Sequence, residues 1–342
     1  MTARARVRLT TRCDDRCVFC GQHGIAERDE PGWRDELQRA RASSDEVSFV
    51  GGEPTLVDAL PEAIAAARAL GFVAIGVQTH ARHLAPARID ALVEAGLGDV
   101  HVGLHGGRAA VHDWHEGIDG GFVATTAAIE RLRARGVTVV ASTVLTRSSF
   151  RVIGELPPLL AALGIAAWTV VVPHVAGRAA ADFDRVVPRL ALSLPFALHA
   201  MDRAQRQGVA VAIAGAPACL LGPWAAEHGD AVARTYPPQC EGCGARARCA
   251  GVDAIYVARF GDAELRPRAA VDRARAMPAA LARMFVGAGE LVPVAVAEHD
   301  TPRAARHRLP QVGKVARAHD EVRGASTENL RELFPDLFEP DE

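Results

Sequence analysis

The chain has 342 residues, of which 49% are hydrophobic, and its formal net charge is −2 at pH 7. A chain of this length and composition can bury a large core. The balanced charge gives no general field that would attract nucleic acid or an anionic membrane. No apolar run precedes the first cysteine, and the most apolar stretch, 209–221, is too short to span a bilayer. We therefore expect a cytoplasmic protein.

Residues 6–210 alternate short apolar runs with longer amphipathic runs. The apolar runs predict six strands, at 6–9, 46–50, 73–77, 99–104, 137–145 and 167–172. The amphipathic runs predict helices at 59–70, 86–95, 125–135 and 154–163, each followed or closed by a glycine, as helix ends favour. Strand–helix repeats of this length indicate parallel βα units, arranged as an open sheet or a barrel.

Polar residues gather where these strands end. The clusters are 51–54, 78–80, 105–107, 142–146 and 174–178. In barrels of parallel strands the chemistry lies at the carboxyl ends of the strands. The two-residue period of a strand further predicts that His101, His105 and Ser142 point into the lumen, because the apolar positions between them should face the helices.

Three cysteines follow the first predicted strand with the spacing C-x3-C-x2-C: Cys13, Cys17 and Cys20. Three thiolates are one fewer than the irons of a 4Fe–4S cube, so one iron would remain free to bind a small molecule. Taken alone, three cysteines also fit a zinc site or a structural cluster.

This motif resembles that of the radical S-adenosylmethionine (radical SAM) superfamily. Phe19 stands before the last cysteine, where the family usually has an aromatic residue near the adenine. A GGEP motif, also typical of the family, follows the second strand as Gly51, Gly52, Glu53 and Pro54. The resemblance implies an α/β fold, a partial (β/α)6 barrel of the TIM type over 1–210. It also implies a 4Fe–4S cluster whose open iron chelates SAM, and a 5′-deoxyadenosyl radical that abstracts a substrate hydrogen.

The same resemblance suggests roles for further residues. Gly51 and Gly52 would let backbone groups approach the methionine amino group. Ser142 is the candidate for the ribose hydroxyls, although its hydroxyl could instead bond to its own backbone. Arg178 would neutralise the SAM carboxylate, with a surface ion pair as the alternative.

Four histidines lie in or just after predicted strand ends: His80, His105, His112 and His115. Of these, His105 is our candidate for a catalytic residue in contact with the substrate. We expect His112 and His115 to lie on a surface loop.

The remaining cysteines form a second set: Cys219, Cys240, Cys243 and Cys249. Four thiolates saturate either a 4Fe–4S cube or a tetrahedral zinc. Behind a radical SAM core the set resembles the auxiliary-cluster regions called SPASM and twitch, and four cysteines fit the single cluster of a twitch region. We assign this cysteine-rich region to 211–267, with a hairpin at 251–265, and leave 268–342 as an extension of unknown role.

Together these features predict a radical SAM oxidoreductase that modifies a peptide or a small natural product, with a flavodoxin or ferredoxin as reductant and no membrane partner. Modification of RNA is an alternative, supported only by a basic stretch at 303–323 and opposed by the near-neutral charge. A non-catalytic iron–sulfur electron carrier is a further alternative. Lys314 is the only lysine, so pyridoxal phosphate chemistry is disfavoured.

Overall fold

A computed structural model describes residues 4–224, 235–246 and 249–269, together with residues 278, 281 and 284. These belong to one unit, Met1–Ala295. Most of the predicted extension 268–342, and all of the basic stretch 303–323, lie outside the described residues. The division into 1–210, 211–267 and 268–342 therefore stays a prediction. Within the described part of the chain, no helix is long and apolar enough to cross a membrane.

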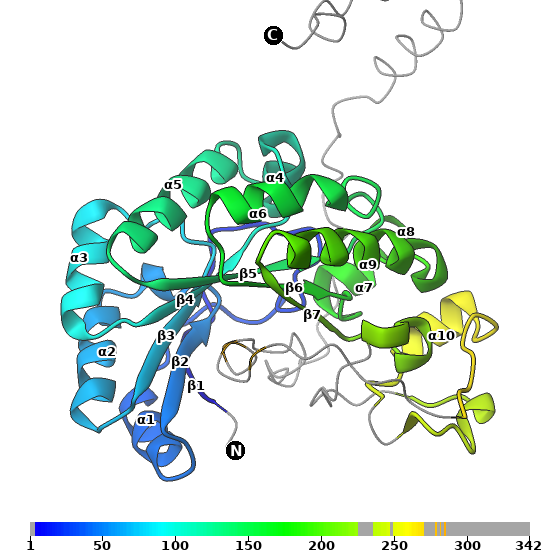
Figure 1. Cartoon of the computed structure of the whole chain (residues 1–342). Helices are drawn as coiled ribbons and strands as arrows, with labels where there is room; N and C mark the ends of the chain where they lie inside the picture. Colours follow the sequence, from blue (N-terminus) through cyan, green and yellow to red (C-terminus); the bar gives the residue numbers. More distant parts are fainter. Residues whose placement is uncertain are drawn as a thin grey trace, which may run out of the picture. The chain divides into compact units, whose positions relative to one another are not determined.

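Seven parallel strands form one curved sheet in which each strand pairs with the next along the chain (Figure 1). They are β1 (Ala5–Thr10), β2 (Glu46–Gly51), β3 (Ala74–Thr79), β4 (Asp99–Gly103), β5 (Thr138–Val144), β6 (Ala167–Val171) and β7 (Ala210–Ala214). Among the described residues β1 and β7 do not pair with each other, so the barrel is partial. The predicted parallel α/β barrel is confirmed, but it has seven strands instead of six.

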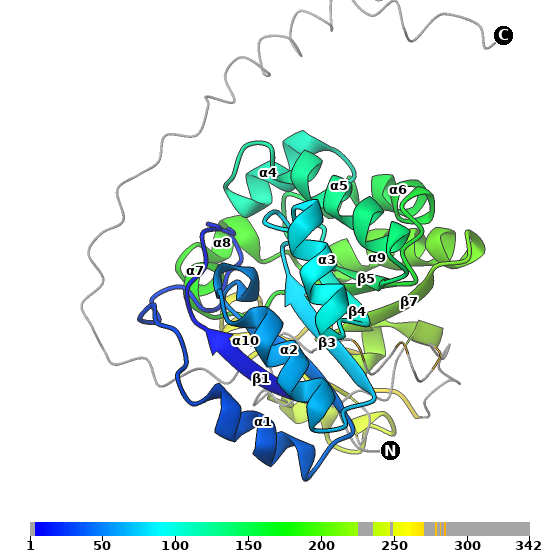
Figure 2. The same ribbon diagram turned by 90° about the vertical axis from the view of Figure 1, so that its left-hand side faces the viewer.

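Helices cover the outer face of the sheet (Figures 1 and 2). In chain order before β7 the helices are α1 (Trp33–Arg41), α2 (Leu60–Ala69), α3 (Pro86–Ala95), α4 (Ala109–Glu116), α5 (Gly121–Ala134), α6 (Leu156–Ala162), α7 (Gly177–Ala181), α8 (Phe183–Val186) and α9 (Leu190–Arg206). Of these, α4 and α7 contact the cysteine loop after β1. Figure 2 shows α1, α2 and α3 side by side over the first strands. The apolar side of the sheet faces these helices, as Val7 and Leu9 of β1 illustrate, since both are buried in the common core. The polar alternate positions are left to the lumen.

Two of the expected helix ends show why glycine is there. Gly71 after α2 has a φ of +84°, and Gly136 after α5 has a φ of +76°. These left-handed conformations are costly for residues with a Cβ atom. The chain can therefore turn sharply from each helix into the next strand.

The predicted hairpin at 251–265 is wrong, because this segment contains the helix α10 (Ala254–Phe260). The helix begins after Asp253, whose carboxylate accepts a hydrogen bond of 2.8 Å from the backbone N–H of Ile255. Tyr256 and Phe260 lie one turn apart, with ring centroids 5.0 Å from each other. An N-cap and an aromatic pair at helical spacing outweigh the strand preference of the β-branched residues in this segment.

Candidate functional site

A cavity of about 330 Å³ opens inside the sheet at the carboxyl ends of the strands. Twelve of the residues named in the sequence analysis line it: Cys13, Cys17, Phe19, Cys20, Gly51, Gly52, Glu53, His80, His101, His105, Ser142 and Arg178. Pro54 does not line the cavity; it begins the short 3-10 helix η1 (Pro54–Leu56) and is buried. The cysteine motif and the GGEP motif thus meet in one place although thirty residues separate them in the sequence.

Gly51 and Gly52 let the end of β2 lie directly against the start of the cysteine loop. The N–H of Gly52 donates to the carbonyl oxygen of Thr10 at 2.9 Å, and the N–H of Glu53 donates to that of Arg12 at 2.7 Å. A Cβ atom on Gly51 would lie 2.2 Å from the Thr10 oxygen, and one on Gly52 would lie 2.1 Å from the Arg12 oxygen. Both glycines are therefore required by the close approach of two backbone segments.

The carboxylate of Glu53 is 1% exposed and is engaged by the protein itself. It accepts hydrogen bonds from the N–H of Thr55 at 2.9 Å, from the Thr79 hydroxyl at 2.6 Å and from the N–H of His80 at 2.9 Å. The glutamate of the GGEP motif thus joins the ends of β2 and β3, and this side chain shapes the cavity wall.

Arg178 approaches the cysteine loop from the start of α7. Its N–H donates to the carbonyl oxygen of Cys20 at 2.9 Å, and its guanidinium donates to that of Cys17 at 3.2 Å. The preceding Gly177 has a φ of +51°, and a Cβ atom there would lie 2.4 Å from the Cys20 oxygen. The positive charge of Arg178 is therefore held at the cavity wall, next to the cysteines.

Helix α4 supports the other side of the cysteine loop. The N–H groups of Arg16 and Val18 donate to the carbonyl oxygens of Glu116 at 2.8 Å and His115 at 2.9 Å. The expectation of surface loop positions for His112 and His115 is wrong, because both lie on α4 and are at most 1% exposed.

His105 lies between this helix and the cavity. Its ring centroid is 4.6 Å from that of Phe19, edge to face, and its backbone N–H donates to His112 Nδ1 at 3.1 Å. The remaining ring nitrogen of His112, Nε2, lies 3.0 Å from Glu116 Oε2. Burial, together with the neighbouring His112, holds the pKa of His105 well below its usual value. His105 therefore faces the cavity as a neutral imidazole at neutral pH.

His115 has partners from outside α4. Its Nδ1 donates to the Val111 carbonyl oxygen at 2.6 Å, so its Nε2 accepts from the hydroxyls of Thr146 at 2.7 Å and Ser148 at 3.0 Å. Burial lowers the pKa of this imidazole as well. These contacts make His115 a buried connection between α4 and the loop after β5.

A polar network next to Cys13 was not anticipated from the sequence. The N–H of Arg82 donates to His80 Nδ1 at 3.1 Å, so the proton of His80 is on Nε2, which donates to Asp14 Oδ1 at 3.0 Å. The Arg82 guanidinium pairs with both Asp14 and Asp15. In the described part of the chain, one group of three possible metal ligands has its donor atoms within 4.8 Å of one another, and it consists of Cys13, Asp14 and His80.

The thiols of the first cysteine set lie in acidic surroundings. Burial, with the carboxylates of Asp15 and Glu53, raises the pKa of Cys13 to about 12. Burial and Asp15 also raise the pKa of Cys17 well above its usual value. Thiolates in such a place need cationic partners, and iron ions and a sulfonium would provide them.

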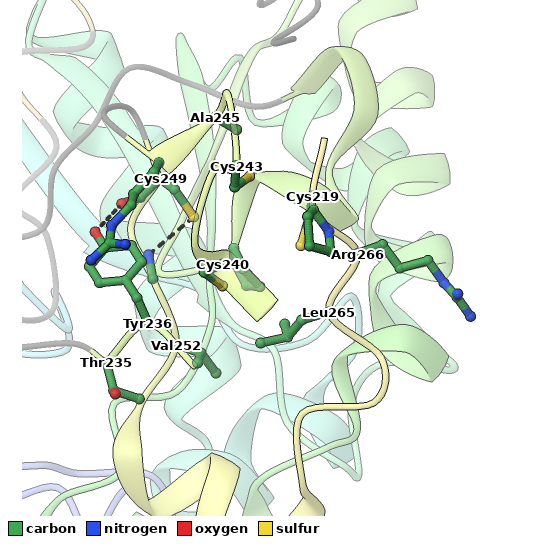
Figure 3. A pocket seen from close by; sticks show the side chains of 14 residues that line it. Cys219, Thr235, Tyr236, Cys240, Cys243, Ala245, Cys249, Val252, Leu265 and Arg266 are labelled. Atoms are coloured by element: carbon green, nitrogen blue, oxygen red, sulfur yellow. Dashed lines mark hydrogen bonds between the residues drawn. The ribbon is translucent and has the colours of Figure 1, made fainter. Parts of the chain in front are cut away.

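The four cysteines of the second set surround one small space (Figure 3). Cys219 follows β7, Cys240 and Cys243 lie in the following loop, and Cys249 precedes α10. The cavity between them holds about 20 Å³. Three backbone N–H groups point at its sulfurs: those of Ala218 and Gly251 lie 3.3 Å from Cys249 Sγ, and that of Arg268 lies 3.4 Å from Cys243 Sγ.

The spacing of these sulfurs differs from that of a zinc site. With Zn–S distances of about 2.3 Å, tetrahedral zinc brings its four sulfurs within about 4 Å of one another. No three of the four sulfurs here lie within 4.8 Å of one another. The wider spacing favours the larger iron–sulfur cube.

Comparison with known proteins now identifies the N-terminal part. Residues 7–148 match the radical SAM superfamily. This part of the chain is therefore similar to a radical SAM domain. The match ends near the close of β5, so the later strands and the second cysteine set lie outside it.

Curated proteins that are similar to part of this chain include PqqA peptide cyclases. That of Ruegeria pomeroyi is 32% identical over 145 residues, which are 41% of this chain and 38% of the relative. That of Xanthomonas euvesicatoria pv. vesicatoria is 34% identical over 146 residues, 41% of this chain and 39% of the relative. The matches thus span less than half the length of these relatives.

Solved structures extend the likeness in fold. The crystal structure of Streptococcus suis SuiB bound to S-adenosylmethionine has a TM-score of 0.54 and 17% sequence identity. The alignment covers 63% of this chain and 51% of SuiB. At this identity the comparison supports the partial barrel alone.

Proposed function

We propose that this chain is an enzyme that cleaves SAM reductively and abstracts a hydrogen atom from a peptide, leading to a net oxidation. The observation that carries the proposal is the convergence of Cys13, Cys17 and Cys20 with the two glycines after β2 and with Arg178 around one cavity. When bound at the three cysteines, a 4Fe–4S cluster would supply the electron that cleaves the sulfonium. The protein's contribution is to bind, orient and exclude water.

The residues around the cavity fit SAM group by group. Arg178 is placed to pair with the methionine carboxylate, and Phe19 offers an aromatic face to the adenine. Ser142, which lines the cavity from β5, is placed to reach the ribose hydroxyls. Glu53 acts indirectly by fixing the strand ends, because its carboxylate is already occupied by protein donors.

The neutral His105 fits substrate contact better than proton donation. An imidazole whose pKa is held well below its usual value carries no extra proton near pH 7. The ring N–H of neutral His105, which is a hydrogen-bond donor, can still orient a substrate group in the cavity. Electron transfer and hydrogen abstraction then need no general acid at this position.

We further propose that Cys219, Cys240, Cys243 and Cys249 bind an auxiliary 4Fe–4S cluster. The sulfur spacing and the three N–H groups directed at sulfur support a cluster, since such hydrogen bonds accompany iron–sulfur sites. The substrate radical left by hydrogen abstraction must lose one electron to become an oxidised product, and this cluster would accept it. A flavodoxin or ferredoxin would supply the first electron.

A peptide is the substrate class best supported. Two PqqA peptide cyclases are 32% and 34% identical to part of this chain, and SuiB, which is similar in fold, has a crystal structure bound to the precursor peptide SuiA. These proteins are similar over only part of their length, so the particular peptide of this chain is expected to differ.

Iron analysis and SAM turnover test these proposals together. Anaerobically reconstituted wild-type protein should bind about eight irons per chain, and about four when the first three cysteines become alanine, by the stoichiometry of two cubes. Reduced wild-type protein should release 5′-deoxyadenosine, and Cys17→Ala should abolish this release. Four irons with one zinc would contradict the auxiliary cluster alone. Failure of the reconstituted wild-type protein to bind or cleave SAM would contradict the proposed SAM-cleaving activity.

A further inference from the structure

The loop between Cys13 and Cys17 carries two acidic residues, Asp14 and Asp15. The Asp15 side chain is 3% exposed, and its Oδ2 lies 3.9 Å from Cys17 Sγ. A cysteine that binds iron has lost its thiol proton, so iron binding places a thiolate next to this buried carboxylate. Like charges so close together oppose each other, and they also oppose the arrival of an electron. The charge balance at Asp15 therefore matters for reduction of the site.

Arg82, which follows β3, supplies a compensating positive charge. Its guanidinium pairs with the other oxygen of Asp15, Oδ1, and with Asp14 Oδ2 at 2.9 Å. The Arg82 side chain is 13% exposed, so water and salt screen these pairs less than pairs at an open surface. Asp15 thus lies between Arg82 and the Cys17 sulfur, with one carboxylate oxygen toward each.

The histidines nearby serve Asp14 and leave Asp15 to this arginine. His80 Nε2 lies 3.0 Å from Asp14 Oδ1 but 3.8 Å from Asp15 Oδ1, which is beyond hydrogen-bond distance. His83 Nε2 lies 2.8 Å from Asp14 Oδ2. Glu116 is 1% exposed, and its negative charge also acts on Asp15. The surroundings of Asp15 are therefore acidic apart from its guanidinium partner.

We propose that Arg82 is a positioning residue that raises the reduction potential of a 4Fe–4S cluster bound at the first cysteine set. It acts through Asp15, whose negative charge it neutralises beside the Cys17 sulfur. A cluster gains one negative charge on reduction, so a positive charge held nearby stabilises the reduced form more than the oxidised form. One electron passes from the reductant to the cluster, and no bond to Arg82 forms or breaks.

The inference rests on the proposed function, because reduction of this cluster precedes cleavage of SAM. It adds the residue that governs how easily the first electron enters. The guanidinium of Arg178 also lies at the cysteine loop, where it donates to the Cys17 carbonyl oxygen. In the proposed function its charge is paired with the SAM carboxylate, so the charge of Asp15 is left to Arg82.

Redox titration of the anaerobically reconstituted protein, followed by EPR, measures the reduction potential without SAM. A europium(II) chelate is the reductant, and the first cluster is the one whose signal changes when SAM is added to a parallel sample, because only this cluster has an open iron. Arg82→Gln should make reduction about ten-fold less favourable, which is a shift of about 59 mV to lower potential for one electron. Arg82→Lys should shift the potential less than half as far, because it keeps the positive charge.

Matched variants separate the charge of Arg82 from a general effect of substitution. Arg88→Gln removes the same charge from α3, where the guanidinium donates to the Val57 carbonyl oxygen, and should leave the potential unchanged. Asp15→Asn added to Arg82→Gln removes one charge of each sign and should return the potential toward the wild-type value. If Arg82→Gln does not keep its iron, Asp15→Asn alone should make reduction about ten-fold more favourable.

Iron content and circular dichroism are recorded for every variant, because a merely structural role would change these without moving the potential. The wild-type potential in iron-loaded Arg82→Gln would overturn the inference. Equal shifts in Arg82→Gln and Arg88→Gln would do the same, as would equal shifts in Arg82→Gln and Arg82→Lys. An unchanged potential in Asp15→Asn would decide against it where Arg82→Gln has no iron.

Release of 5′-deoxyadenosine from the same wild-type preparation keeps this inference apart from the proposed function. Normal release, with one potential shared by the wild-type protein and Arg82→Gln, refutes only the role of Arg82. The expected shift in Arg82→Gln without any release refutes only the SAM-cleaving function. A wild-type protein in which no EPR signal responds to SAM contradicts both.

Discussion

The carboxylate of Glu53 accepts a hydrogen bond from the backbone N–H of His80 at 2.9 Å, and this contact joins the ends of two neighbouring strands next to the cysteines. The same carboxylate accepts from the Thr79 hydroxyl. In this chain the glutamate of the GGEP motif therefore joins two strand ends. Its contact with the backbone of His80 also positions the His80 ring against Asp14. The cavity wall therefore depends on a carboxylate whose oxygens are already occupied by donors of the protein itself.

Replacing Glu53 should lower the stability of the protein. Glu53→Gln substitutes a donor for one acceptor oxygen and leaves buried donors unpaired, so the free energy of unfolding should fall by about 2 kcal/mol or more. Urea unfolding followed by circular dichroism measures this. Glu62→Gln is the control, because Glu62 is 59% exposed and pairs with Arg34 at the surface. Equal effects of the two substitutions would contradict the role of Glu53.

The contact between β2 and the cysteine loop predicts intolerance of any side chain at Gly52. In Gly52→Ala the new Cβ atom would overlap the Arg12 carbonyl oxygen, so the loop must shift. We expect iron in the first site to fall by at least half after reconstitution. Gly32→Ala, at an open position with φ of −85°, should keep its iron. Full iron content in both variants would show that the loop can move without losing its ligands.

The neutral buried histidines predict a dependence of stability on pH. The pKa of His101 is about 4 in the folded chain and about 6.5 when unfolded, so the unfolded chain binds more protons between these values. Stability is therefore complete above pH 6.5 and is lost as the pH falls toward 4. Protonation linked to His101 alone should lower the free energy of unfolding by about 2 kcal/mol between pH 6.5 and pH 5. His105 and His115 should lower it further, because their pKa values are also depressed in the folded chain.

Urea unfolding at these two pH values measures the loss. His101→Gln should show a smaller difference between pH 6.5 and pH 5 than the wild-type protein, because one neutral buried imidazole is gone. His199→Gln, at an exposed position of α9, should show the wild-type difference. The same difference in all three proteins would rule out His101 as a source.

Much of the barrel was predictable because its strands are apolar runs separated by amphipathic helices. The seventh strand was missed, although its sequence alternates Val211 and Ile213 with alanines, a period of two residues that indicates a strand. Ala212 pairs in register with Thr169, which lines the cavity, so a small side chain at this position suits the lumen side of the strand. The strand lies within the longer apolar stretch 209–221, so the apolar pattern did not indicate where the strand ends.

The cofactor motifs were predictable, but the network around them was not. The cysteine spacing and the GGEP sequence identify local chemistry. By contrast, Asp14, His80 and Arg82 come together only because two strand ends meet, and His115 is buried because Thr146 and Ser148 offer it partners from another loop. Such long-range pairing leaves no mark in the periodicity of either segment.

Arg178 offers the sharpest test of how SAM is held. In Arg178→Ala the backbone N–H still donates to Cys20, so the loop keeps its main anchor while the guanidinium is lost. SAM affinity should fall about 10- to 100-fold, the cost of a charge-assisted hydrogen bond, while iron content stays at the wild-type value. Arg178→Lys should fall between the two proteins, because it keeps the charge without the planar fork. Arg203→Ala is the control, since Arg203 donates to Gly154 on the outer surface. Lost iron together with lost SAM binding in Arg178→Ala would mean that the guanidinium supports the cysteine loop instead, and unchanged SAM affinity would remove Arg178 from the binding site altogether.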